Sequence, residues 1–201
     1  MKTQVLFVQG GGKNAHEEDQ KLAASRQVVL GSDYNVLFPR MPKESDPEYW
    51  RWKTDIARRI ARLGGEPLLV GHSVGGAILL KYLSETKFDA PIAGLFLLAA
   101  PFIGADESWQ EDAVQVDFSK ISELPRTFLY HCRDDQVVPF GHLAVYSGKL
   151  SSATIRVFRN GGHQFRNRVS EIASDIRILK GDAGANPTGL TNRRSHPRGL
   201  G

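Results

Sequence analysis

The sequence predicts an α/β fold, a three-layer sandwich in which a mostly parallel, six-stranded sheet carries helices on both faces. Short apolar runs alternate with segments of helical period along most of the chain, which is the pattern of such a sheet. The run at residues 67–72 has the length and continuous apolarity of a strand buried on both faces. At 201 residues the chain is long enough for one domain with a sizeable core.

The six strands are expected at the apolar runs 4–9, 34–38, 67–72, 92–99, 127–132 and 154–158. Between the second and third strands, Asp46 is a good N-cap and Pro47 suits the first helical position. Apolar side chains then recur at spacings of three and four residues until Gly64 and Gly65 end the helix. The remaining helices are expected at 17–30, 77–83, 139–150 and 169–179.

We expect one domain at residues 1–180, followed by a disordered tail at residues 181–201. Three arginines against one aspartate give the tail a charge of +2, half of the formal net charge of +4. The tail is interpreted as a solvated extension or a cloning remnant, against the alternative of a weak arm for nucleic acid or a protein partner. The charge is therefore no indication of a nucleic-acid-binding domain.

The composition favours a cytoplasmic protein without disulfides. Cys132 is the only cysteine, so no internal disulfide can form, and its apolar run is typical of a core thiol. No apolar run approaches the ~20 residues that a membrane span needs. The apolar start of the chain is too short for a secretory signal and lacks a small-residue cleavage site, so it is interpreted as the first strand. We expect no membrane association, and nothing in the sequence indicates an oligomeric state.

The most specific local feature is the Gly-His-Ser-Val-Gly sequence of residues 71–75, at the end of the third expected strand. In a nucleophile elbow a buried strand turns sharply into a helix, and the serine at the apex projects its hydroxyl from a strained backbone position. The two glycines are needed because side chains there would block the close approach of strand and helix. Ser73 is therefore the candidate nucleophile.

A serine hydroxyl needs a base to take its proton and a third group to orient that base. Asp135 follows the fifth expected strand, and His163 follows the sixth after two glycines that let the backbone approach the elbow. Either residue could serve only a turn or a loop, but three suitable residue types fall in order at three strand ends. Asp134 is the nearer alternative for the acid, and Asp106 or Glu107 is the more remote one.

Two backbone amides are needed to bind the oxyanion of a tetrahedral intermediate. Val74 N–H follows the nucleophile, and the glycine loop at residues 10–12 is expected to supply Gly11 N–H. That loop fits neither a Gly-x-Gly-x-x-Gly pattern nor a Walker loop, which argues against a phosphate site. The histidines have no zinc-binding spacing, so we expect neither a metal nor a cofactor. Packing or surface positions are expected for His72, His131 and His142.

With these residues assembled, the chain resembles the α/β-hydrolase superfamily and, in its size, the small, lid-poor branch that includes the retinoblastoma-binding serine hydrolases. The likeness spans residues 5 to about 180, and its carriers are residues 10–12, 71–76, 135–139 and 162–163. It implies a minimal α/β-hydrolase fold with a triad of Ser73, Asp135 and His163. Many relatives have His-Gly at the oxyanion loop, where this chain has Gln9-Gly10.

The predicted activity is hydrolysis of small-molecule carboxylic esters or thioesters with small or medium acyl groups, through an acyl-enzyme on Ser73. The apolar walls of the acyl site are expected at Phe102, Trp109 and Phe165. The aperiodic stretch 101–125 either forms such a wall or is a surface excursion with one short helix. The alternative from another class is a hydrolase fold retained for binding, which engages a protein through residues 102–118 or the basic tail.

Overall fold

A computed structural model of the chain describes residues 2–87, 91–104, 114–118, 121 and 124–181. Several predictions fall outside the described residues. They are those for Trp109, for the remote acid candidates Asp106 and Glu107, and for the tail beyond residue 181.

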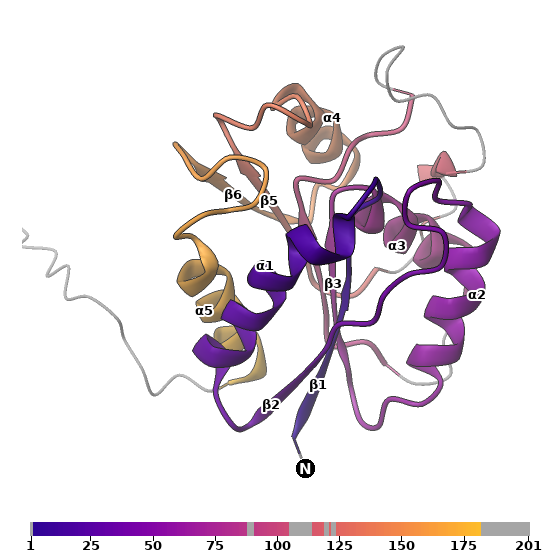
Figure 1. Cartoon of the computed structure of the whole chain (residues 1–201), viewed down its shortest axis with the longest axis vertical. Coiled ribbons are helices and arrows are strands. Elements are labelled where there is room, and N and C mark those ends of the chain that lie inside the picture. Colours follow the sequence, from indigo (N-terminus) through magenta and orange to yellow (C-terminus); the bar gives the residue numbers. More distant parts are fainter. Residues whose placement is uncertain (1, 88–90, 105–113, 119–120, 122–123, 182–201) are drawn as a thin grey trace, which may run out of the picture.

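The predicted six-stranded sheet is confirmed, and all of its strand pairs are parallel (Figure 1). Its strands are β1 (Thr3–Val8), β2 (Tyr34–Leu37), β3 (Leu68–His72), β4 (Gly94–Leu98), β5 (Thr127–Cys132) and β6 (Thr154–Phe158). The strand order is β2-β1-β3-β4-β5-β6. The order reverses between β1 and β3, and a crevice forms at the carboxyl ends of strands at such a switch point. The loop after β1 and the turn after β3 both lie at this position.

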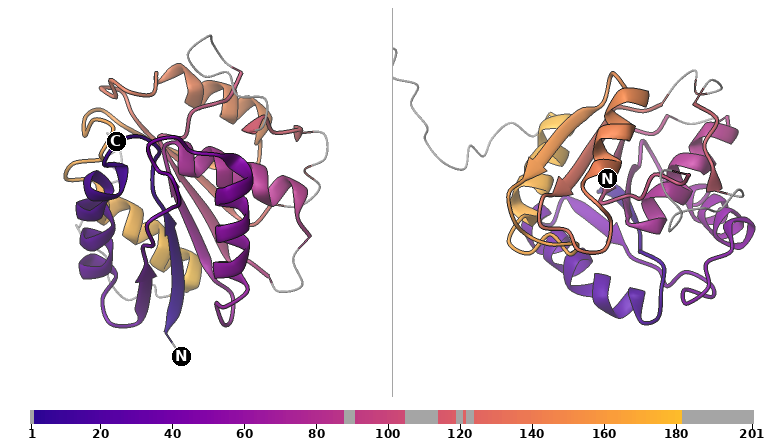
Figure 2. Two further views of the ribbon diagram at one scale, coloured as in Figure 1. Left: turned by 45° about the vertical axis from the view of Figure 1, so that its right-hand side comes forward. Right: turned by 90° about the horizontal axis from the view of Figure 1, so that it is seen from above.

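Five helices are seen among the described residues, and they cover both faces of the sheet. They are α1 (Ala15–Leu30), α2 (Tyr49–Ile60), α3 (Val74–Glu85), α4 (Gly141–Lys149) and α5 (Val169–Lys180). Helices α1 and α5 lie together on one face, and α2 and α3 lie on the other (Figures 1 and 2). Side chains of α4 join the core on the side of α2 and α3. The predicted three-layer sandwich is thus confirmed.

The start of α2 differs from the prediction. The helix begins at Tyr49 and not next to Asp46, because Glu48 still has an extended backbone with φ −98° and ψ 120°. The preceding segment is bound to the glycine loop instead. Gly12 N donates to the Glu44 carbonyl at 2.6 Å, and a Cβ on Gly11 would lie 2.5 Å from Pro47 Cγ. These long-range contacts outweigh the local capping preference.

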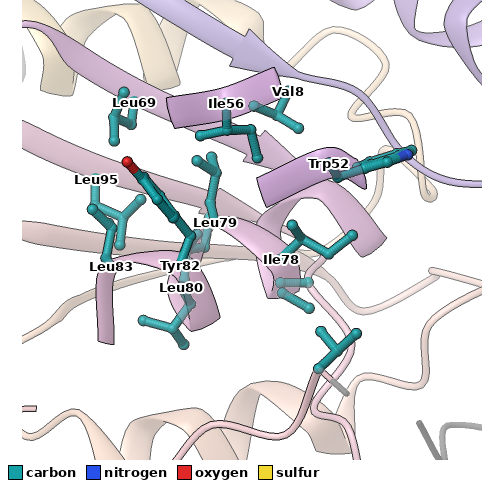
Figure 3. Close-up of a cluster of buried hydrophobic side chains, with 14 of the residues drawn as sticks. Val8, Trp52, Ile56, Leu69, Ile78, Leu79, Leu80, Tyr82, Leu83 and Leu95 are labelled. Carbon is teal, nitrogen blue, oxygen red and sulfur yellow. The ribbon is translucent and has the colours of Figure 1, made fainter. Parts of the chain in front are cut away.

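Two apolar cores lie on the two faces of the sheet. The core beneath α2, α3 and α4 includes Trp52, Ile56, Ile78 and Leu79, all with no exposed surface (Figure 3). Full burial of each such side chain stabilises the fold by about 2 kcal/mol. The second core fills the space between the sheet and α1 and α5. Within the described ranges, no helix combines the length and the apolarity that a bilayer crossing requires.

Candidate active site

The turn from β3 into α3 has the geometry of a nucleophile elbow. Ser73 lies at its apex with φ 51° and ψ −130°, and it is 5% exposed. A non-glycine residue in such a conformation costs about 1–3 kcal/mol and persists only where its surroundings enforce it. Here Ser73 N donates to the Leu98 carbonyl of the neighbouring strand at 2.8 Å. The sheet edge therefore holds the strained serine in place.

Close packing around the elbow explains its glycines. A Cβ on Gly75 would lie 2.1 Å from the Gln9 carbonyl oxygen, and a Cβ on Gly71 would lie 2.5 Å from Gly76 Cα. No side chain fits at these distances, so the steric requirement predicted for both glycines is confirmed. The end of β1 consequently lies directly against the start of α3.

His163 contacts Asp135 at the same edge of the sheet. His163 Nδ1 lies 2.9 Å from Asp135 Oδ2, and the other carboxylate oxygen accepts from Val137 N at 2.8 Å and Val138 N at 3.0 Å. Burial acts to raise the pKa of Asp135, but hydrogen bonds from His131 and His163 outweigh it and hold the pKa well below its ordinary value. The carboxylate is therefore ionised and accepts the Nδ1 proton of His163.

The adjacent aspartate has a different partner. Asp134 accepts from Gly161 N at 3.2 Å and from Gly162 N at 2.9 Å, so it fixes the glycine pair that precedes His163. Of the two neighbouring candidates for the acid, Asp135 is the one that contacts the imidazole.

The imidazole of His163 lies beside the elbow. Its ring centroid is 4.6 Å from that of His72, and His72 Nε2 lies 2.9 Å from the His163 carbonyl oxygen. His72 directly precedes Ser73 in the chain. Burial lowers the pKa of His163, although the hydrogen bond with Asp135 opposes the shift. The imidazole is thus a neutral base at neutral pH, at the edge where the serine lies.

Backbone amides surround the same position. A Cβ on Gly10 would lie 3.2 Å from Ser73 Cβ, and one on Gly11 would lie 3.4 Å from Val74 Cβ. Gly10 N donates to Asp19 at 2.7 Å and Gly12 N to the Glu44 carbonyl, so their amides are occupied. Gly11 N–H has no acceptor among the described residues. Val74 is the first residue of α3, where the helix leaves the amide unpaired.

The predicted wall residues occupy different environments. Phe102 is half-buried after β4, stacks on Phe118 with ring centroids 5.6 Å apart and meets the Tyr146 ring edge-on at 5.1 Å. Phe165 is fully buried in the core on the side of α1 and α5, with φ 51°. A ring without exposed surface cannot contact a bound acyl chain. The expectation that Phe165 lines the pocket is therefore corrected.

His72, His131 and His142 are buried, so a surface position is excluded for these three. Their side chains are 1%, 1% and 3% exposed, in that order. His72 contacts Asp19, His131 contacts Asp135, and His142 accepts from Phe102 N. A buried histidine must find partners for its ring nitrogens. No group of three His, Cys, Asp or Glu side chains in the described part of the chain is placed to hold a metal ion.

Comparisons with known proteins agree on the fold. The ydeN gene product of B. subtilis superposes with a TM-score of 0.66 at 20% identity, covering 90% of this chain and 100% of that one. SOBER1 of Arabidopsis thaliana superposes with a TM-score of 0.64 at 17% identity, covering 90% of this chain and 100% of that one. Est1E of Butyrivibrio proteoclasticus superposes with a TM-score of 0.66 at 13% identity, covering 90% of this chain and 88% of that one. No curated protein matches the chain. The serine hydrolase family model matches residues 30–167, more than half of the sequence, and the chain belongs to this family of α/β-hydrolase-fold proteins.

Proposed function

We propose that this serine hydrolase cleaves carboxylic esters or thioesters through an acyl-enzyme on Ser73. The observation that carries the proposal is the Asp135–His163 contact of 2.9 Å beside a strained serine at one edge of the sheet. A serine in a strained turn is a costly feature that a purely structural site does not need. With its lone buried thiol, Cys132, the protein is proposed to act in the cytoplasm.

The first half of the reaction transfers the acyl group to the enzyme. Because Nδ1 of His163 donates to Asp135, the lone pair of the imidazole is on Nε2, which takes the proton as Ser73 Oγ attacks the carbonyl carbon. The tetrahedral oxyanion is bound by the Val74 and Gly11 amides. Nε2 then gives its proton to the leaving alcohol or thiol as the C–O or C–S bond breaks.

Water completes the cycle. Nε2 of His163 removes a proton from water as the oxygen attacks the acyl carbon, and it returns that proton to Ser73 Oγ when the acid leaves. Asp135 stabilises the imidazolium in both halves, and no cofactor takes part. Small or medium acyl groups are proposed because the half-buried, stacked rings of Phe102 and Phe118 offer a short apolar surface after β4.

The proposal is tested by labelling with a fluorophosphonate, which reacts with activated serines. The wild type and a Ser25→Ala control, altered at an exposed serine on α1, should both be labelled and should hydrolyse p-nitrophenyl esters. Ser73→Ala should show neither reaction while it retains the wild-type circular dichroism spectrum. Folded wild-type protein that is not labelled at Ser73 would refute the proposal. The comparisons give no support to the alternative of a hydrolase fold retained for binding.

A further inference from the structure

A second carboxylate is buried at the candidate site without a part in the proposed reaction. Asp19 of α1 is 1% exposed and accepts from Gly10 N at 2.7 Å, His72 Nδ1 at 2.8 Å and the Gln164 side chain. Burial acts to raise the pKa of Asp19, but the charge and hydrogen bond of His72 and the other donors outweigh it and lower the pKa. Asp19 is therefore an ionised carboxylate with three donors around it.

Both ring nitrogens of His72 lie against oxygen acceptors. Nδ1 faces the Asp19 carboxylate at 2.8 Å, and Nε2 faces the His163 carbonyl at 2.9 Å. Both partners only accept hydrogen bonds, so both ring nitrogens must donate. This contact pattern is that of a doubly donating ring paired with the Asp19 carboxylate, and the two side chains are 1% and 2% exposed. A buried ion pair lies directly beneath the elbow.

Three consecutive residues of the loop after β6 contact this pair. His163 offers its carbonyl to His72, Gln164 donates to Asp19, and the Phe165 ring lies edge-on to the His72 ring with centroids 6.3 Å apart. The Phe165 ring itself has no exposed surface. The part of the loop that carries His163 therefore lies against the pair.

We propose that the Asp19–His72 ion pair is a positioning device for the hydrolytic site. One carboxylate binds the glycine loop through Gly10 and the elbow through His72, and His72 in turn binds the backbone of His163. The three parts of the site come from the loops after β1, β3 and β6, which no stretch of local structure connects. The inference deepens the proposed function and rests on it.

The charge of the pair also acts on the base. The His72 ring lies 4.6 Å from that of His163 and opposes its protonation, while Asp135 and, more weakly, Asp19 favour it. Asp134 faces the glycine pair before His163, and Arg26 lies near Asp19 from α1. Removal of the charge at position 72 should therefore raise the pKa of His163. As the medium is acidified, such a variant should lose activity at a higher pH than the wild type does.

Two substitutions at His72 separate positioning from packing. In His72→Gln the amide nitrogen occupies the place of Nε2 and can still donate to the His163 carbonyl, but Asp19 loses its partner. In His72→Asn the amide nitrogen occupies the place of Nδ1 and keeps Asp19 paired, but the His163 carbonyl loses its donor. We expect kcat to fall by about 100-fold in the Asn variant and about tenfold in the Gln variant, with KM nearly unchanged. Melting temperatures should follow the opposite order, because an unpaired buried carboxylate destabilises more.

A second pair of variants keeps the test decisive if the His72 variants do not fold. Asp19→Asn removes the counterion of His72, and Glu18→Gln is the matched control, an adjacent exposed acid on the same helix. The lost His72 charge acts on His163 more strongly than the lost Asp19 charge, so the acidic limb of the kcat/KM profile should move up by about 0.5 to 1 pH unit in Asp19→Asn only. Identical profiles for the two variants, or activities at position 72 that follow the melting temperatures, would overturn the inference. In either case the wild type would remain active and dependent on Ser73, whereas failure of the proposed function would remove wild-type activity itself.

Discussion

Replacing Asp135 with asparagine should nearly abolish hydrolysis while leaving the fold intact. The asparagine oxygen can still accept from Val137 N and Val138 N, which lie 2.8 Å and 3.0 Å from the present oxygen. The new amide group, however, brings a donor against His163 Nδ1, which is itself a donor in the wild type. The ring relieves this conflict by moving its proton to Nε2, and the lone pair that should accept the serine proton is lost.

The size of the effect follows from the role of the tautomer. In serine triads of this kind the wrong tautomer lowers kcat by about 10⁴-fold. At 1.36 kcal/mol for each factor of ten, this is about 5 kcal/mol of lost transition-state stabilisation. Loss of the charged hydrogen bonds to Asp135 should reduce the free energy of unfolding by only about 1 to 3 kcal/mol, so that the variant remains folded at 25 °C.

The assay is kcat/KM for p-nitrophenyl acetate together with the rate of fluorophosphonate labelling. Asp134→Asn is the comparison variant, since it neutralises the neighbouring carboxylate, which binds the Gly161 and Gly162 amides and not the imidazole. We expect its kcat/KM to fall by less than about tenfold, because one acceptor remains on an exposed loop. Activity of Asp135→Asn within tenfold of the wild type, or an equal loss in both variants, would show that Asp135 does not orient the base.

Three further predictions concern stability and pH. Gly75→Ala should lower the free energy of unfolding by at least about 2 kcal/mol, because its Cβ would lie 2.1 Å from the Gln9 carbonyl oxygen. The control is Gly64→Ala, whose Cβ meets nothing within 4 Å. Equal urea midpoints for the two variants would contradict the prediction. The kcat/KM of the wild type should reach half its maximum below pH 6.5, since burial lowers the pKa of His163 and keeps the base neutral; a midpoint above 6.5 would be contrary. Arg26→Met should raise the free energy of unfolding by about 1 to 3 kcal/mol, because the Arg26 nitrogens are buried without hydrogen-bond partners among the described residues and burial lowers the pKa of Arg26 to about 9. A loss of stability on urea unfolding would mean that the contact of the guanidinium with the Phe7 ring, 4.6 Å from its centroid, outweighs the desolvation of the charge.

The sheet could be predicted from the sequence because central strands of a covered parallel sheet are apolar throughout. Strands β5 and β6 begin and end where their apolar runs do, and the other four differ by one or two residues at one or both ends. The start of α2 could not be predicted in the same way. Asp46 and Pro47 have the local character of a helix start, but contacts with the glycine loop, more than thirty residues away in the sequence, decide where the helix begins.

The positions of the candidate site residues at the strand ends could also be predicted from the sequence. Asp135 and His163 each follow a strand, and the carboxyl ends of parallel strands share one edge, so their meeting follows from topology. The direction of side chains within the loop after β6 does not follow from topology. Gly161, Gly162 and Phe165 have positive φ, and these turns send the Phe165 ring into the core and away from the edge.

The Asp19–His72 pair could not be predicted from the sequence pattern. Glu17, Glu18 and Asp19 are consecutive acids in the first turns of α1, where acids are favoured by the helix dipole and usually face solvent. Only the third is buried, because the register of α1 against the sheet places it beneath Gly10. His72 lies in a strand that is buried at every residue, so no alternation shows which way its ring points. The residues proposed to react follow strand ends and can be found along the chain, whereas the burial of Asp19 and the direction of the His72 ring depend on the packing of one layer on another.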